Sequence, residues 1–187
     1  PYFRGYSLET MYRVLLTFSL FILTFATSVA PYPGWQQAVD YTMDITVDTT
    51  AHQYSGSMKV VLRNNSPEAL DKAYFHLFFN AFQPGSMMDV RSRTISDPDR
   101  RVGSRIFELP EDEWGWIEVA SLRVNGKPVA FEHDGTLLDV TLNSAINAGK
   151  KATFEMEWTA QVPRQIRRSG WMNKEGVEYS MTQWYPK

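Results

Sequence analysis

Residues 39–48 read VDYTMDITVD, and apolar and polar side chains alternate along them without a break. Val39, Tyr41, Met43, Ile45 and Val47 fall on one face of an extended chain, and aspartates and threonines fall on the other. A period of two is typical of an antiparallel strand that buries one face. This stretch therefore predicts a half-buried β strand.

The same alternation recurs along most of the chain after residue 48. It is found in residues 54–62, 117–124, 129–133, 138–142, 154–162 and, more weakly, 177–181. The phase slips by one residue near Ala120, which predicts a β bulge. Asn125-Gly126 and Asp134-Gly135 predict tight hairpins. Since no helical stripe of useful length is found, the prediction is an all-β fold: an antiparallel β-sandwich or saddle-like open barrel of about eight or more strands.

Two segments depart from the alternation. Residues 73–79 (AYFHLFF) are apolar on both faces except for His76, which predicts a strand covered on both sides. Residues 83–105 hold Pro84-Gly85, Asp97-Pro98 and five arginines with little periodicity. They predict a long, partly ordered excursion.

The amino-terminal residues resemble a secretion signal. Met11 and Arg13 precede twelve uncharged residues, 14–25, and small residues follow at 26–30. Twelve helical residues span about 18 Å, too short for a hydrocarbon core of about 30 Å, so a cleaved signal peptide at 11–30 is favoured over a stable membrane anchor. Residues 1–10 are then translated upstream DNA or the result of a start site placed too early. The protein is expected to be exported, to a bacterial periplasm, cell envelope or the extracellular space, with residues 31–187 as one β domain.

Composition excludes several functional classes. The 187 residues are 43% hydrophobic and 14% aromatic, typical of a folded domain, and a net charge of −2 disfavours nucleic acid as a partner. The absence of cysteine excludes disulfides, thiolate zinc sites and a cysteine nucleophile. None of His52, His76 and His133 lies in an H-E-x-x-H pattern, and there is neither a G-x-S-x-G motif nor a glycine-rich phosphate loop. No catalytic residue and no metal ligand is expected in this chain.

Charged and aromatic clusters leave one alternative open. Arginines at 91, 93, 100, 101 and 105 alternate with aspartates at 89, 97 and 99, which favours self-neutralisation over an acidic partner. The acidic run 108–113 is expected to be a solvated loop. Trp158 alternates with core residues, whereas Trp114 and Trp116 flank a glycine and could stack on sugars. A free-standing secreted β-sandwich that binds a protein or a glycan therefore remains an alternative.

Three further stretches carry a resemblance to a known family. The start Trp35-Gln36-Gln37, followed by the first strand and the turn Arg63-Asn64-Asn65-Ser66-Pro67, resembles aminopeptidase N-type zinc metallopeptidases (peptidase family M-one, the gluzincins). The run LDKAYFHLFFNAFQPGS at 70–86 is similar to theirs. The closing YSMTQWYP at 179–186 resembles the Thr-Gln segment at which their amino-terminal and catalytic domains meet. The likeness covers residues 35–187.

This resemblance implies an amino-terminal, saddle-shaped β domain without catalytic residues of its own. Zinc, H-E-x-x-H and the peptide substrate would be bound by a thermolysin-like catalytic domain downstream, which is the implied intramolecular partner; the chain is then a fragment of the enzyme. Gln183 matches the glutamine that lines the family's substrate pocket, and Tyr185 stands where the family has Gln or Glu. A phenol cannot pair with an ammonium group as glutamate does.

Alternation predicts that Gln183 and Tyr185 lie on one strand face, about 7 Å apart. The alternative is that Gln183 only satisfies backbone groups at a domain junction.

Overall fold

The computed structural model describes residues 13, 34–95 and 100–187. The chain forms two compact units, Pro1–Trp35 and Gln36–Lys187, and all the strands of the described residues lie in the second. The signal peptide expected at residues 11–30 falls, apart from Arg13, outside the described residues. Within the described ranges, no helix has the length and apolar character needed to cross a bilayer.

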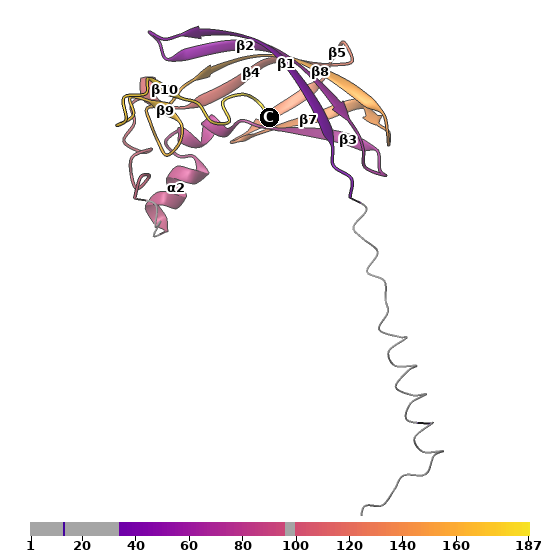
Figure 1. The fold of residues 1–187 in the computed structure, drawn as a ribbon, viewed down its shortest axis with the longest axis horizontal. Helices are drawn as coiled ribbons and strands as arrows, with labels where there is room; N and C mark the ends of the chain where they lie inside the picture. The colour runs from indigo at the N-terminus through magenta and orange to yellow at the C-terminus, as the bar shows by residue number, and fades with distance from the viewer. Residues whose placement is uncertain (1–12, 14–33, 96–99) are drawn as a thin grey trace, which may run out of the picture. The chain divides into compact units, whose positions relative to one another are not determined.

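The second unit is mostly antiparallel β structure, as the alternation predicts (Figure 1). A five-stranded sheet has the order β1-β2-β8-β4-β5, a three-stranded sheet the order β3-β7-β6, and a two-stranded sheet the order β10-β9. The strands are β1 (Ala38–Asp48), β2 (Gln53–Arg63), β3 (Leu70–His76), β4 (Trp116–Val124), β5 (Lys127–Pro128), β6 (Ala130–Asp134), β7 (Leu137–Ile146), β8 (Lys151–Gln161), β9 (Gly170–Trp171) and β10 (Tyr179–Ser180).

Two long, unbroken ladders join β1, β2 and β8 in the five-stranded sheet. β1 and β2 pair over eleven positions, from Ala38 with Arg63 to Asp48 with Gln53, and β2 pairs with β8 over eleven more. On β8 every second side chain is buried, as a period of two requires. The expected core position of Trp158 is confirmed, since its side chain is 1% exposed.

The two larger sheets share one hydrophobic core. Phe75 of β3 and Phe154 of β8 meet edge to face with ring centroids 5.5 Å apart. Leu138 and Val140 of β7 are fully buried in the same cluster as Val60 of β2. The buried faces therefore point toward each other, and the polar faces of the strands point to solvent.

The predicted bulge and both predicted hairpins are confirmed. In the β4–β8 ladder Val119 pairs with Trp158 and Ser121 with Glu157, so Ala120 is the extra residue. Asn125 and Gly126 take positive φ of 51° and 78°, which a two-residue hairpin loop of this kind needs. The turn after Asp134 places Leu137 opposite it.

The prediction of a strand at residues 73–79 that is covered on both sides is wrong, both in where the strand ends and in how far it is buried. β3 stops at His76, and Phe78–Phe82 form a 3-10 helix, η1, whose Phe79 and Phe82 are buried. Tyr74 is 57% exposed, so the strand is covered on one side only. A run of aromatic residues looks the same whether a strand or a buried helical turn holds it.

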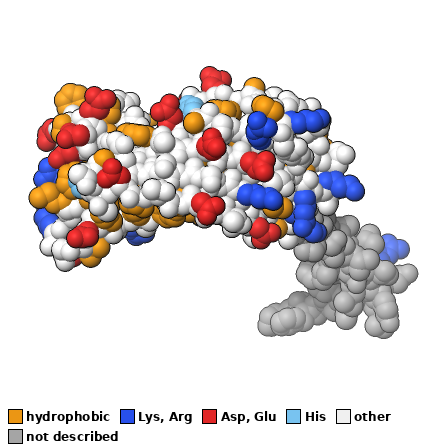
Figure 2. Space-filling model, turned by 90° about the horizontal axis from the view of Figure 1, so that it is seen from above, with side chains coloured by type: hydrophobic (Ala, Val, Ile, Leu, Met, Phe, Trp, Pro, Cys, Tyr) orange, Lys and Arg blue, Asp and Glu red, His pale blue; other side chains and the backbone are white. Residues whose placement is uncertain are grey.

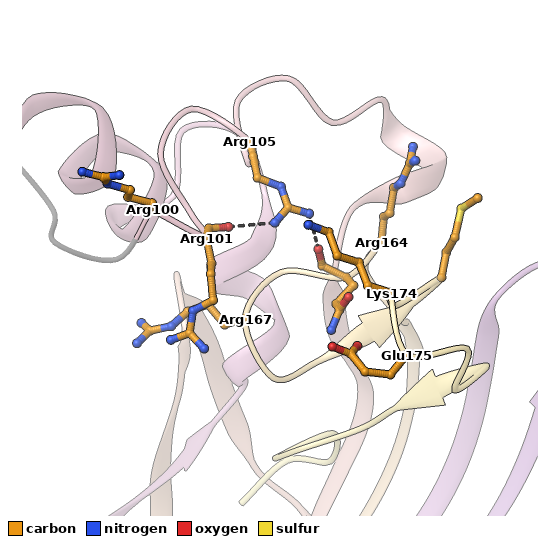
Figure 3. Close-up of a pocket in the computed structure, with 9 residues that line it drawn as sticks. Arg100, Arg101, Arg105, Arg164, Arg167, Lys174 and Glu175 are labelled. Carbon is orange, nitrogen blue, oxygen red and sulfur yellow. Dashed lines mark hydrogen bonds between the residues drawn. The ribbon is translucent and has the colours of Figure 1, made fainter.

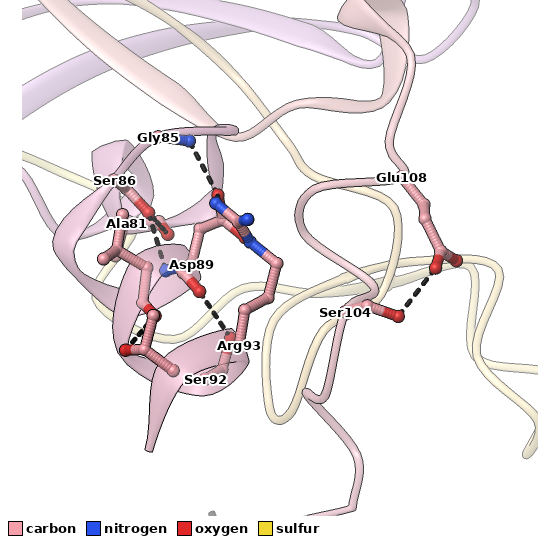
Figure 4. Close-up of polar contacts among 10 residues, drawn as sticks. Ala81, Gly85, Ser86, Asp89, Ser92, Arg93, Ser104 and Glu108 are labelled. Atoms are coloured by element: carbon pink, nitrogen blue, oxygen red, sulfur yellow. Dashed lines mark hydrogen bonds and ion pairs between the residues drawn. The ribbon is translucent and has the colours of Figure 1, made fainter. Parts of the chain in front are cut away.

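Residues 83–105 contain a helix that the sequence pattern does not predict: α2 (Met87–Thr94) (Figure 4). Ser86 caps it by accepting a hydrogen bond from Asp89 N at 3.1 Å. The Asp89 carboxylate is fully buried, and it accepts from Gly85 N at 2.8 Å and from two Arg93 nitrogens at 2.9 Å. Self-neutralisation in the arginine cluster is thus confirmed for one pair.

Opposing forces act on the Asp89 carboxyl group. Burial raises its pKa, but the hydrogen bonds from Arg93 and from the Gly85 backbone, with the Arg93 charge, outweigh burial and hold the pKa below the ordinary value. Asp89 is therefore ionised in the folded chain and ties α2 to the loop before it. The remaining short helix among the described residues is η2 (Glu111–Glu113), within the acidic run.

Candidate functional site

The segment that carries Gln183 and Tyr185 is largely irregular. Of residues 163–187, here called the irregular end, only β9 and β10 are strands, with two residues each. Residues 181–187 form no strand, and Gln183 has a left-handed φ of 56°. The prediction that Gln183 and Tyr185 share a strand face is wrong, because the backbone turns at Gln183.

Both neighbours of Gln183 are anchored. The Thr182 hydroxyl lies 2.7 Å from the Ser169 hydroxyl, and Ser169 Oγ also donates to the Thr182 carbonyl at 3.1 Å. On the other side, the Trp184 carbonyl accepts a hydrogen bond from the Tyr54 hydroxyl. Burial raises the pKa of Tyr54 far above its ordinary value, so this hydroxyl stays protonated and remains a donor.

Gln183 itself is exposed between these anchors. A left-handed conformation costs a residue with a side chain roughly 1–2 kcal/mol, and it persists only where the surroundings impose it. The Gln183 amide has no hydrogen-bond partner among the residues that the structure describes. The amide therefore faces solvent.

Tyr185 takes part in packing. Its ring meets the Tyr41 ring edge to face at 5.5 Å and the Trp184 ring at 5.2 Å. Burial raises the pKa of Tyr41, and the nearby Tyr185 hydroxyl raises it further. Trp184 in turn contacts the Tyr54 ring at 5.9 Å. Tyr185 is therefore half-buried on the sheet while Gln183 is exposed, although the sequence pattern alone places both residues on one wall.

The last residue is also fixed. Lys187 and His76 exchange two backbone hydrogen bonds, of 2.6 and 3.1 Å, so the chain reaches the end of β3. Residues 184–187 thus run from the five-stranded sheet to the three-stranded one. No sequence signal indicates this tie, because it joins positions more than a hundred residues apart.

The three histidines make structural contacts. His52 stacks on Trp171 at 4.0 Å, and its Nδ1 is 2.6 Å from the Tyr179 hydroxyl. His133 Nε2 accepts from Val119 N at 3.2 Å, and His76 stacks on Phe78. In the described ranges, no group of three or more His, Asp or Glu side chains could hold a metal ion.

The tryptophans considered for glycan stacking are half-buried. Trp114 donates its indole N–H to the Leu109 carbonyl at 2.9 Å, which fixes the ring against the loop. Trp116 begins β4 in the ladder with β8. Neither ring is a fully exposed platform.

Comparison with known proteins finds similarity of fold. No family model matches the sequence, and no curated protein matches it. An M1 zinc metallopeptidase mutant bound to L-tryptophan, described as a two-domain enzyme, matches with a TM-score of 0.47 and 17% identity, over 79% of this chain and 27% of that one. The M1 zinc metallopeptidase from Deinococcus radiodurans matches with a TM-score of 0.47 and 15% identity, over the same shares. A mutant of the Deinococcus radiodurans enzyme bound to a Tyr-Ser-Ala substrate matches with a TM-score of 0.46 and 16% identity, over 78% and 26%.

These structures belong to the family that the sequence resembles, and the match falls on their amino-terminal part. The chain spans about a quarter of the length of the structures it matches.

Proposed function

We propose that this chain is the amino-terminal β domain of an exported zinc metallopeptidase of the aminopeptidase N type. In that enzyme it packs on the catalytic domain, with the saddle shape of the family, and places Gln183 at the edge of the substrate pocket. The observation that carries the proposal is the exposed amide of Gln183, unpartnered among the described residues and held in a left-handed conformation between two anchored neighbours. Strained conformations of this kind cluster at binding and catalytic sites.

The chemistry of Gln183 suits a peptide. Its amide offers a carbonyl acceptor and an NH₂ donor, the complements of a peptide N–H and C=O. One neutral hydrogen bond contributes on the order of 0.5–1.5 kcal/mol, which is several-fold in affinity. Tyr185 packs against the Trp184 and Tyr41 rings, and this packing holds in place the chain that follows Gln183.

The described residues do not fit a zinc site, so no step of catalysis is assigned to them. Zinc, which polarises a scissile carbonyl and activates water in such enzymes, would be bound by the catalytic domain downstream. This chain would contribute positioning and recognition only.

Exposed apolar side chains support a packed partner. Met87, Val90 and Ile95 on and after α2 are 88%, 43% and 56% exposed, and Phe107 is 57% exposed. On the face drawn in Figure 2, hydrophobic side chains also gather at the end of the molecule that carries β9 and β10. Exposed apolar patches typically mark interaction surfaces, and a second domain would cover them.

The first test is the reading frame beyond Lys187. We expect it to continue and to encode H-E-x-x-H within a few hundred codons. A stop codon directly after Lys187 would refute the proposal and favour the alternative, a free-standing secreted β-sandwich that binds a protein or glycan.

The second test concerns Gln183 in the full-length enzyme. Gln183→Ala should weaken hydrolysis of aminoacyl-anilides several-fold, by a factor that depends on the substrate's first residue, with zinc content and melting temperature unchanged. The matched control is Gln36→Ala, which removes another exposed glutamine. Equal losses for all substrates together with lower stability would make Gln183 a structural joint.

Export has its own test. Expressed in a bacterium with its native leader, the protein should gain a new amino terminus between residues 29 and 35. Amino-terminal sequencing of exported protein that finds Met11 or Pro1 retained would contradict cleavage.

A further inference from the structure

A cleft of about 780 Å³ lies between three loops at the irregular end, and its walls are strongly basic (Figure 3). Six cationic side chains line it: Arg100, Arg101, Arg105, Arg164, Arg167 and Lys174. Glu175 is the one carboxylate in the lining. The chain as a whole has a net charge of −2, so this concentration of positive charge is local. We call it the basic cleft.

Arg105 is held in place without being neutralised. Its two terminal nitrogens donate to the carbonyl oxygens of Arg101 at 2.8 Å and Gln165 at 2.5 Å. These acceptors are uncharged, so the guanidinium keeps its full charge and N–H donors to spare. Figure 3 shows Arg105 between Arg100 on one side and Arg164 on the other. A fixed, unneutralised guanidinium is prepared to bind a carboxylate or phosphate.

Among the other cations of the cleft, Arg164 is held by an ion pair, whereas Lys174 is held by none within the described part of the chain. Arg164 pairs with Glu113 at 2.8 Å, which fixes one wall. Lys174 has no ion-pair partner among the described residues. The cleft thus presents at least two cationic groups, Arg105 and Lys174, that no described carboxylate neutralises.

Size and lining favour a peptide over a phosphate. A volume of about 780 Å³ is in the range of pockets that take extended organic ligands, and it is far larger than one inorganic anion needs. Glu175 would repel a polyphosphate but can accept a hydrogen bond from a peptide N–H. Met172, 66% exposed, and the Gln165 amide offer apolar and polar contact to a peptide chain.

We infer that the basic cleft binds an acidic peptide, one with at least two carboxylates. The Arg168 carbonyl accepts hydrogen bonds from Ser180 Oγ at 2.7 Å and from Thr182 Oγ1 at 3.3 Å. The loop that forms one wall of the cleft is therefore tied to the segment that carries Gln183. The inference rests on the proposed function in one respect: in the peptidase this peptide would be a substrate with acidic residues after its first position.

The experiment measures binding by the full chain, without zinc or catalysis. The probe is a fluorescein-labelled hexapeptide of alternating alanine and glutamate, followed by fluorescence anisotropy at low salt, with the alanine–glutamine hexapeptide as the uncharged comparison. Binding of the acidic peptide alone is expected. The double variant Arg105→Gln/Lys174→Gln should bind it roughly tenfold more weakly, since two exposed charge pairs are lost.

The matched control removes the same charges elsewhere. Arg63 and Lys151 are exposed cross-strand neighbours at the edge of the β2–β8 ladder, and Arg63→Gln/Lys151→Gln should leave binding unchanged. Lys174→Gln alone removes no hydrogen bond or ion pair among the described residues, so a several-fold loss in that variant answers any concern about folding of the Arg105 variant.

Three results would overturn the inference: no binding of the acidic peptide, equal weakening in both double variants, or tighter binding of tripolyphosphate through Arg105 and Lys174. None of them bears on H-E-x-x-H or on Gln183. A failure here therefore leaves the proposed peptidase role intact, and failure of that role leaves peptide binding measurable.

Discussion

The five-stranded sheet and the irregular end hold their backbones in different ways. In the sheet, ladders of eleven pairs fix every residue of β2, and side chains only choose which face is buried. In the irregular end the ladder is two residues long, and side-chain hydrogen bonds and ring contacts fix the chain. Of the five described non-glycine residues with positive φ, three lie there: Arg167, Met172 and Gln183. Where the ladders stop, the backbone conformation varies from residue to residue, and polar side chains such as that of Gln183 stay exposed.

The sharpest test of this contrast removes the residue that joins the two regions. Trp158 is 1% exposed and contacts Tyr54 at 5.3 Å and Trp184 at 6.1 Å. Trp158→Ala should lower the free energy of unfolding by about 3–5 kcal/mol, because a large cavity opens in the sheet. Urea unfolding followed by circular dichroism measures this. Trp116→Ala, which truncates a half-buried ring on β4, is the control, and an equal loss there would contradict a special role for Trp158.

The next largest effect should be confined to the irregular end. Gly170 has a φ of 136°, and a Cβ there would lie 2.2 Å from Gln165 Cα. Gly170→Ala should destabilise this end by roughly 1–3 kcal/mol, since the backbone must shift. Hydrogen exchange should then rise in residues 163–187 but not in β2 or β8. Gly149→Ala is the control, because its φ is also positive but nothing lies within 4 Å of a Cβ placed there. Increased exchange throughout the sheet would show that the two regions unfold as one.

The smallest effect concerns pH. The pKa of Asp89 is lowered in the folded chain, so its ionised form adds stability above the unfolded value of about 3.9, and this stability is lost as pH falls through the folded pKa. Urea midpoints should show wild type more stable than Asp89→Asn at neutral pH, with the gap narrowing below about pH 4. The control is Asp71→Asn, which removes an exposed carboxylate on β3. A gap that is constant with pH would mean that the Asp89 charge is unimportant.

Much of the sheet can be predicted because its determinants are local. Alternation over 154–162, the slip at Ala120 and the turn at Asn125-Gly126 each act within a few residues, and each is found as expected. The strand expected at 39–48 is also found, but only Tyr41, Met43 and Ile45 of its apolar face are partly buried, since Val39 and Val47 at its ends are exposed. Helix α2 escapes such prediction because its stability comes from one buried carboxylate bound to Arg93 and Gly85, which no periodicity records. The aromatic run after His76 has the pattern of a strand and forms a helical turn, because burial alone does not distinguish the two.

The candidate site likewise has features that the local sequence predicts and features that depend on contacts between distant residues. The sequence alone proposes Gln183 and Tyr185, through the resemblance of residues 179–186, and it predicts the mostly β structure that is found. Only the tertiary structure decides how the two side chains lie, because Tyr54 and Ser169 reach residues 184 and 182 across 130 and 13 positions of the chain. It also decides that arginines from residues 100–105 and 164–167, which look like separate loops in the sequence, line one cleft. Strand patterns are set by neighbours in sequence, whereas binding surfaces arise where distant loops meet, and that meeting is fixed by the packing of the whole domain.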